Sequence, residues 1–161
     1  MGSGKTTIGK IVAAFLNRPF TDTDLLIEVK TGKKVSEIFR RKGEAFFRRE
    51  ESLILIALQN APAGVIAVGG GMVLSPFNRE ILRRGIWFHL KVSVPVILSR
   101  IGNATGRPLL KKGTKRDEVE RLLRSRGPLY DLAPNQIDTD GLAPDTVAEA
   151  IAQKIRRGNF R

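Results

Sequence analysis

The chain contains no cysteine, which excludes disulfide bonds and thiolate metal sites and is typical of a cytoplasmic protein. Aromatic residues are also few, with one tryptophan, one tyrosine and eight phenylalanines, so few rings are available to stack on single-stranded nucleic acid. No apolar run approaches the roughly 18 residues that a membrane-spanning helix needs. A charged helix is predicted directly at the N-terminus, where a signal peptide would be apolar. We therefore expect a cytoplasmic protein with no membrane contact.

The 161 residues suffice for one domain with one core, and no repeat, low-complexity tract or linker divides residues 1–161. The chain carries 28 lysines and arginines against 16 aspartates and glutamates, a net charge of +12. Such a surface could bind nucleic acid, or it could gather small polyanions such as ATP and an acidic substrate. Because stacking aromatics are few, we favour small polyanions and expect no nucleic-acid partner.

The N-terminal sequence Gly2-Ser3-Gly4-Lys5-Thr6-Thr7 matches the second half of a phosphate-binding loop, G-x-x-x-x-G-K-[ST]. In such a loop, glycines let backbone N–H groups approach a phosphate, the lysine supplies charge for the β- and γ-phosphates, and the threonine hydroxyl binds Mg²⁺. Apolar residues spaced three and four apart predict a helix over 5–17, whose positive end would face the anion. The alternative is a glycine-rich tail before an ordinary helix.

Short apolar runs alternate with helical patterns along the rest of the chain. This alternation predicts an α/β fold with a parallel sheet covered on both faces. The basic stretch 102–116 has no strong period and is predicted to be a mobile lid. We expect strands at 19–21, 65–68, 86–92 and 136–138, and further helices at 25–30, 35–42, 44–59, 77–84, 93–100, 117–126 and 145–157.

Two aspartates, Asp22 and Asp24, follow the first predicted strand. In open α/β sheets the carboxyl ends of the strands border the ligand crevice. One aspartate could hold Mg²⁺ through water, and the other could accept a proton or hydrogen bond from a substrate hydroxyl. Alternatively, one of them caps the next helix.

Arg48 and Glu51 lie three residues apart in a predicted helix, so an intrahelical ion pair is one interpretation. The other is a guanidinium that grips a substrate carboxylate in a bidentate fork, with Glu51 orienting it. The three glycines Gly69–Gly71 follow an apolar strand and indicate either a turn or a close approach of backbone to a ligand.

Two further arginines are candidates for anion binding. Arg107 lies in the predicted lid and could close over a site, or it is simply part of a solvated charge run. Arg126 lies at a predicted helix end, where the helix dipole alone would favour it. His89, the only histidine, lies within a predicted strand and is expected to be a packed residue without a catalytic role.

Together and in this order, these motifs resemble those of the shikimate kinases, from Met1 to the last helix. The matching segments include G-S-G-K-T-T-I-G, D-T-D-L-L-I-E, G-E-A-F-F-R-R-E-E, V-G-G-G-M-V-L-S-P, G-R-P-L-L and R-G-P-L-Y. The D-T-D, F-R-R, G-G-G and R-P-L-L set distinguishes this family from the gluconate and adenylate kinases, which share the phosphate loop and lid.

The resemblance implies a P-loop kinase-type three-layer sandwich that transfers the γ-phosphoryl of MgATP to the 3-hydroxyl of shikimate, a step of aromatic amino acid biosynthesis. A kinase for another small hydroxy acid such as gluconate, and a non-catalytic nucleotide-binding homologue, remain as alternatives.

The resemblance also implies roles for individual residues. Lys5, Asp24 and Arg107 would be catalytic, with Asp24 binding the reacting hydroxyl and Arg107 reaching the transferring phosphate. Mg²⁺ would be held by Thr6 and, indirectly, by Asp22. ATP would be bound by Gly2, Ser3, Gly4, Lys5, Thr6, Thr7 and Arg107, with Arg100 and Pro144 on either side of adenine. Shikimate would be bound by Asp24, Phe39, Phe47, Arg48, Gly69, Gly70, Gly71 and Arg126.

The family's sheet has the order 2-3-1-4-5, and its central first strand precedes the phosphate loop. That strand is missing from this sequence, so we expect the natural chain to start upstream of Met1. We also expect a gap, or a foreign segment, between the strands at 65–68 and 86–92. Unless a partner strand replaces the missing one, the protein is expected to be a monomer.

Overall fold

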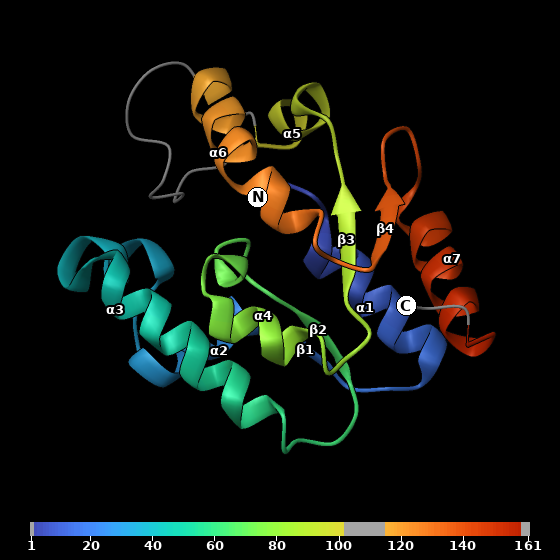
Figure 1. Cartoon of the computed structure of the whole chain (residues 1–161), viewed down its shortest axis with the longest axis horizontal. Coiled ribbons are helices and arrows are strands. Elements are labelled where there is room, and N and C mark those ends of the chain that lie inside the picture. The colour runs from blue at the N-terminus through green and yellow to red at the C-terminus, as the bar shows by residue number, and fades with distance from the viewer. Residues whose placement is uncertain (1, 102–114, 159–161) are drawn as a thin grey trace.

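The computed structural model describes residues 2–101 and 115–158, in which helices and strands alternate as predicted (Figure 1). Arg107 and most of the predicted lid, residues 102–114 of 102–116, lie outside the described residues. Among the described residues, no helix is both long and apolar enough to cross a membrane. The elements are α1 (Lys5–Leu16), β1 (Phe20–Asp22), α2 (Thr23–Thr31), α3 (Val35–Leu58), β2 (Val65–Ala67), the 3-10 helix η1 (Met72–Leu74), α4 (Pro76–Leu82), β3 (Phe88–Lys91), α5 (Val94–Ile101), α6 (Lys115–Tyr130), β4 (Asn135–Asp138) and α7 (Pro144–Arg156).

The four strands form two separate parallel pairs. In the first pair Phe20 of β1 is opposite Val65 of β2, and in the second Phe88 of β3 is opposite Asn135 of β4. Within the part of the chain that the structure describes, β2 and β3 do not pair with each other. The predicted parallel strands and the predicted gap at this place are both confirmed.

Helix α1 joins the two strand pairs. Its buried residues Ile8 and Val12 belong to a core cluster that includes Val65 of β2 and Phe88 of β3, together with the apolar stripe of α7. Figure 1 shows α1 running beside α7, while α2 and α3 lie toward the opposite side of the molecule. Because burial of apolar side chains is the main stabilising contribution in a domain, this shared cluster holds the two halves together.

Two helices show how glycine and proline act in this fold. Gly43 has φ 81° and ψ 171° and kinks α3, as its predicted place between two helices suggested. Helix α6, by contrast, continues past Gly127 and Pro128 to Tyr130, although we predicted its end at residue 126. Proline removes one N–H but tolerates helical φ, and the N–H of Asp131 still donates to the Gly127 carbonyl at 2.9 Å.

Candidate active site

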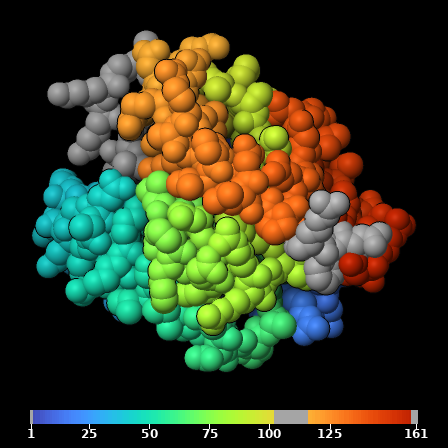
Figure 2. Space-filling model, viewed as in Figure 1, coloured from blue at the N-terminus to red at the C-terminus, as the bar shows by residue number. Residues whose placement is uncertain are grey.

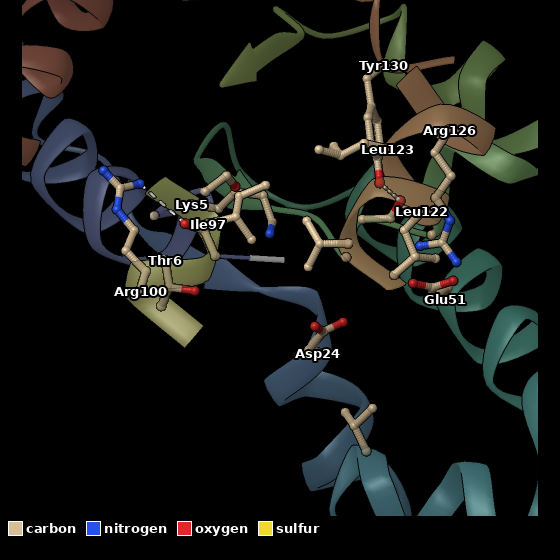
Figure 3. Close-up of a pocket in the computed structure, with 18 of the residues that line it drawn as sticks. Lys5, Thr6, Asp24, Glu51, Ile97, Arg100, Leu122, Leu123, Arg126 and Tyr130 are labelled. Carbon is tan, nitrogen blue, oxygen red and sulfur yellow. Dashed lines mark hydrogen bonds between the residues drawn. The ribbon is translucent and has the colours of Figure 1, made fainter. Parts of the chain in front are cut away.

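A cavity of about 520 Å³ is lined by the phosphate loop, by residues of α1, α2, α3, α5 and α6, and by Gly69–Gly71 after β2. Of the predicted site residues within the described part of the chain, all but Asp22 and Pro144 line it. In the view of Figure 3, Lys5 and Thr6 lie on one side, Arg126 and Glu51 lie on the other, and Asp24 lies between. The volume is within the range of small-molecule sites.

The phosphate-binding side is formed by the residues just before and at the start of α1. Gly4 precedes the helix with φ 82°, a left-handed conformation that glycine adopts without steric cost. Lys5 is the first helical residue, so the exposed N–H groups of the first turn face the same space as its side chain. Arg100 of α5 donates from Nη1 to the Gly2 carbonyl at 3.2 Å, which ties this loop to α5.

Asp22 caps a helix, one of the alternatives that the sequence left open, and also accepts a hydrogen bond from the phosphate loop. Its Oδ1 accepts hydrogen bonds from the backbone N–H groups of Asp24 at 3.0 Å and Leu25 at 3.4 Å, and so caps α2. Its Oδ2 accepts from the Thr6 hydroxyl at 2.8 Å. A carboxylate and a hydroxyl are thereby held together beside the phosphate loop.

Asp24 is the carboxylate that lies between the two sides of the cavity (Figure 3). Burial raises its pKa, and the charge of Asp22 raises it further, while Lys5 and Arg48 oppose the rise. Its Oδ1 is buried and has no hydrogen-bond partner among the described residues. An acidic group in this state is a better proton acceptor at neutral pH than an ordinary surface aspartate.

We predict that Asp24→Asn stabilises the ligand-free protein. Because the folded-state pKa is raised, the ionised carboxylate costs stability, and this cost grows as the pH rises from about 4 through the folded-state pKa. At pH 7 we expect Tm to rise on the order of 2–4 °C, the shift that about 1 kcal/mol produces in a domain of this size. Thermal unfolding at pH 4 and pH 7 measures it.

Asp140→Asn is the matched control with the opposite sign. Hydrogen bonds from Ser93, chief among the causes, hold the pKa of Asp140 below its usual range, so removing its charge should lower Tm at pH 7. An Asp24→Asn protein that melts at or below the wild-type temperature at pH 7 would contradict the buried, destabilising carboxylate.

Arg48 lies over two aromatic rings on the other side of the cavity. Its Nη1 donates to Glu51 Oε2 at 2.6 Å, and its Nε and Nη2 donate to Glu44 Oε1 at 3.1 and 2.8 Å. The guanidinium carbon lies 5.8 Å from the Phe39 ring centre and 5.5 Å from that of Phe47, within cation–π range. The intrahelical ion pair is therefore present, and the same guanidinium also faces the cavity.

Glu51 is fully buried, and burial raises its pKa while Arg48 opposes the rise. One of its oxygens is engaged by Arg48, but Oε1 has no hydrogen-bond partner among the described residues. Glu51 thereby favours the present orientation of Arg48, because rotation of the guanidinium away from it would leave a buried charge unpaired.

The glycine turn, Gly69–Gly71, admits these charged side chains against its backbone. A Cβ on Gly69 would lie 2.6 Å from Glu51 Oε1 and 2.8 Å from Asp24 Oδ1. A Cβ on Gly71 would lie 2.0 Å from Arg48 Nη1. Neither glycine has a positive φ, so a substitution at either position would act by displacing these charged side chains and not by straining the backbone.

Helix α6 supplies one wall of the cavity, partly from residues that we did not predict. Leu122, Leu123 and Tyr130 line it together with the predicted Arg126 (Figure 3). With Val119 they form a stripe at helical spacing, and this pattern was the sequence signal that could have identified them. The remaining predicted residue, Pro144, is the first residue of α7 and does not line the cavity.

The sequence and structure match one family in each comparison with known proteins. The shikimate kinase family model matches residues 1–156. Shikimate kinases from Pelotomaculum thermopropionicum and Thermodesulfovibrio yellowstonii are 40% and 42% identical to the chain, which covers 94% and 91% of their lengths and is itself matched over 99% and 98%. A solved structure titled as shikimate kinase from Acinetobacter baumannii in complex with shikimate superposes with a TM-score of 0.93 at 38% identity, over 100% of this chain and 91% of that one. The chain therefore belongs to the shikimate kinase family, as its motifs predicted.

Proposed function

We propose that the chain transfers the γ-phosphoryl group of ATP to the 3-hydroxyl of shikimate, an activity consistent with its family. The observation that carries this proposal is a single cavity with a phosphate loop at one end, two arginines at the other and Asp24 between them. A phosphoryl donor and a hydroxy acid can therefore meet at a carboxylate. Catalysis of this kind depends mainly on positioning and charge stabilisation.

At the nucleotide end, Lys5 and the N-terminus of α1 would bind the β- and γ-phosphates and stabilise the charge that develops on them. The hydroxyl of Thr6 and the carboxylate of Asp22, 2.8 Å apart, are hard oxygen donors that suit Mg²⁺. The described residues contain no cluster of three or more metal-ligating side chains, and Mg²⁺ in kinases needs none because phosphates and water complete its shell. When bound, the ion would neutralise charge on the phosphates.

At the acid end, Arg48 and Arg126 would bind the shikimate carboxylate, and the rings of Phe39 and Phe47 would pack against the carbocycle. Asp24 would accept the hydrogen of the 3-hydroxyl, and its raised pKa suits it to take that proton as the new O–P bond forms.

An ADP-release assay with separate shikimate and gluconate reactions tests the proposal. We expect ADP release to depend on shikimate and to remain at the acid-free background with gluconate. Turnover with gluconate that equals or exceeds the shikimate rate would identify a kinase for another acid. ATP binding without shikimate-dependent release would identify a non-catalytic nucleotide-binding protein.

We predict that Gly71→Ala raises the KM for shikimate about tenfold or more. The new methyl group would occupy the place of the Arg48 guanidinium, so the arginine must leave its position at the acid end. A tenfold change corresponds to about 1.4 kcal/mol, less than the usual cost of disturbing a charge-assisted pair. Initial-rate kinetics with each substrate varied in turn measure it.

Gly85→Ala is the control for this change, because a Cβ there would meet only the Leu82 carbonyl, at 3.8 Å. It should leave both KM values within twofold of the wild type. A Gly71→Ala enzyme with an unchanged shikimate KM would exclude Arg48 from acid binding in its present position.

A further inference from the structure

The three carbonyl groups of the glycine turn accept hydrogen bonds from two kinds of donor, backbone N–H groups and a side-chain hydroxyl. The first and third accept from backbone N–H groups of Met72 and Leu74 in the adjoining 3-10 helix, each at 3.0 Å. The middle carbonyl, that of Gly70, accepts from the side-chain hydroxyl of Tyr130 at 2.8 Å, 60 residues further along the chain. The turn is thus anchored locally at both ends and remotely at its centre.

Tyr130 is the last residue of α6 and follows Arg126 by four positions. Residues four apart lie on the same face of a helix, and both side chains line the cavity. Figure 3 shows the bond from the Tyr130 hydroxyl and Arg126 on the same helix. The hydroxyl therefore links the helix that carries Arg126 to the turn against which Arg48 packs.

The end of α6 needs such a link, because its last turn contains Gly127 and Pro128. Pro128 cannot donate a backbone hydrogen bond, and Gly127 adds conformational freedom. Of the backbone bonds beyond the helix, that from Asp131 N–H to the Gly127 carbonyl closes this turn. A bond from Tyr130 to a different element compensates for the weakened helix terminus.

The ring and the hydroxyl of Tyr130 make separate contacts. The ring lies 5.3 Å from the His89 ring and packs on a cluster formed by Val73, Trp87 and Ala133. The hydroxyl donates to the glycine turn. A phenylalanine would keep the packing and lose the link, so the two contributions can be distinguished by experiment.

From this geometry we infer that Tyr130 is a positioning residue for acid recognition. Its hydroxyl fixes the separation between the glycine turn and the last turn of α6, and hence the separation between Arg48 and Arg126. This inference rests on the proposed function, in which the two arginines bind one carboxylate. The bond joins the last turn of α6, whereas α6 packs on α5 and the phosphate-loop side through Val119 and Leu123, nearer its other end. The KM for ATP should therefore depend on the bond much less than the KM for shikimate.

Kinetics of Tyr130→Phe test this role, with Ser125→Ala as the matched control. Ser125 is on the same helix, but among the described residues its hydroxyl donates within α6, to the Leu122 carbonyl at 3.2 Å. We expect Tyr130→Phe to raise the KM for shikimate about 3–10-fold, the equivalent of one hydrogen bond, with kcat and the ATP KM within twofold. Ser125→Ala should change none of the three. An unchanged shikimate KM, or equal changes in both KM values, would overturn the inference.

Hydrogen exchange in the ligand-free protein gives a second measurement that requires no activity. The N–H groups of Met72 and Leu74 should exchange faster in Tyr130→Phe than in the wild type and in Ser125→Ala, because their acceptors belong to the loosened turn. Unchanged exchange would overturn the inference even if kinetics were altered. A wild-type protein that does not phosphorylate shikimate would instead reject the proposed function, and the exchange result would still decide whether Tyr130 holds the turn.

Discussion

Lys5→Met is expected to lower kcat by about 10²-fold or more. Lys5 is the first residue of α1 and lines the phosphate end of the cavity. Its charge would offset the negative charge that develops on the transferring phosphoryl group. Removal of one preorganised electrostatic contact from an active site typically costs this much. Methionine has similar length and is compatible with the first turn of a helix, so the loss should concern charge rather than packing.

Lys10→Met controls for the loss of one positive charge on the same helix. Lys10 is exposed and does not line the cavity. Its replacement should leave kcat within twofold, measured by ADP release at saturating substrates. Activity of Lys5→Met within threefold of the parent would remove Lys5 from the catalytic group.

Arg48→Ala should raise the KM for shikimate by far more than the KM for ATP. A carboxylate held by two guanidinium groups loses roughly 2–5 kcal/mol when one partner is truncated, which is about 30-fold or more in affinity. Separate titrations of the two substrates in the ADP-release assay measure the difference. Parallel increases in the two KM values would leave Arg48 with only its intrahelical ion pair.

Two further variants separate recognition from folding. Arg48→Ala leaves the buried Glu51 without its cation, so Tm must be measured beside the kinetics. Arg48→Lys keeps a charge near Glu51 but loses the fork, and it should also raise the shikimate KM. Arg49→Ala should leave the shikimate KM unchanged, because the Arg49 guanidinium lies 5.9 Å from the Phe46 ring and does not line the cavity.

Local sequence patterns predicted much of the fold because the determining interactions are local. The apolar spacing in α1, the glycine at position 43 and the alternation of strands and helices all act within a few residues. The end of α6 was placed too early because Gly127 and Pro128 are strong local stop signals. Packing of Leu129 and Tyr130 on the cluster around Trp87 outweighs those signals, and such contacts are not visible in the sequence.

The site shows the same division. The phosphate loop and the D-T-D, F-R-R and G-G-G motifs identified residues that do converge on one cavity. Sequence left open whether Asp22 caps a helix or binds a ligand, and it did not show that Asp22 also accepts from Thr6, because each carboxylate oxygen has a different partner. Nor could it show that the bulk against Gly71 is the guanidinium of Arg48, because their proximity arises only from folding.

The crowding at the glycine turn also limits how this enzyme can be redesigned. Any side chain at Gly69 or Gly71 would displace a charged group of the same cavity. Substitutions there should therefore weaken substrate binding and not simply change the shape of the pocket. Leu122 and Leu123 on the α6 wall contribute apolar surface, and because both also pack in the core, they can be exchanged only for apolar residues of similar volume. A library intended to widen acid specificity should hold the glycines constant and vary the leucines.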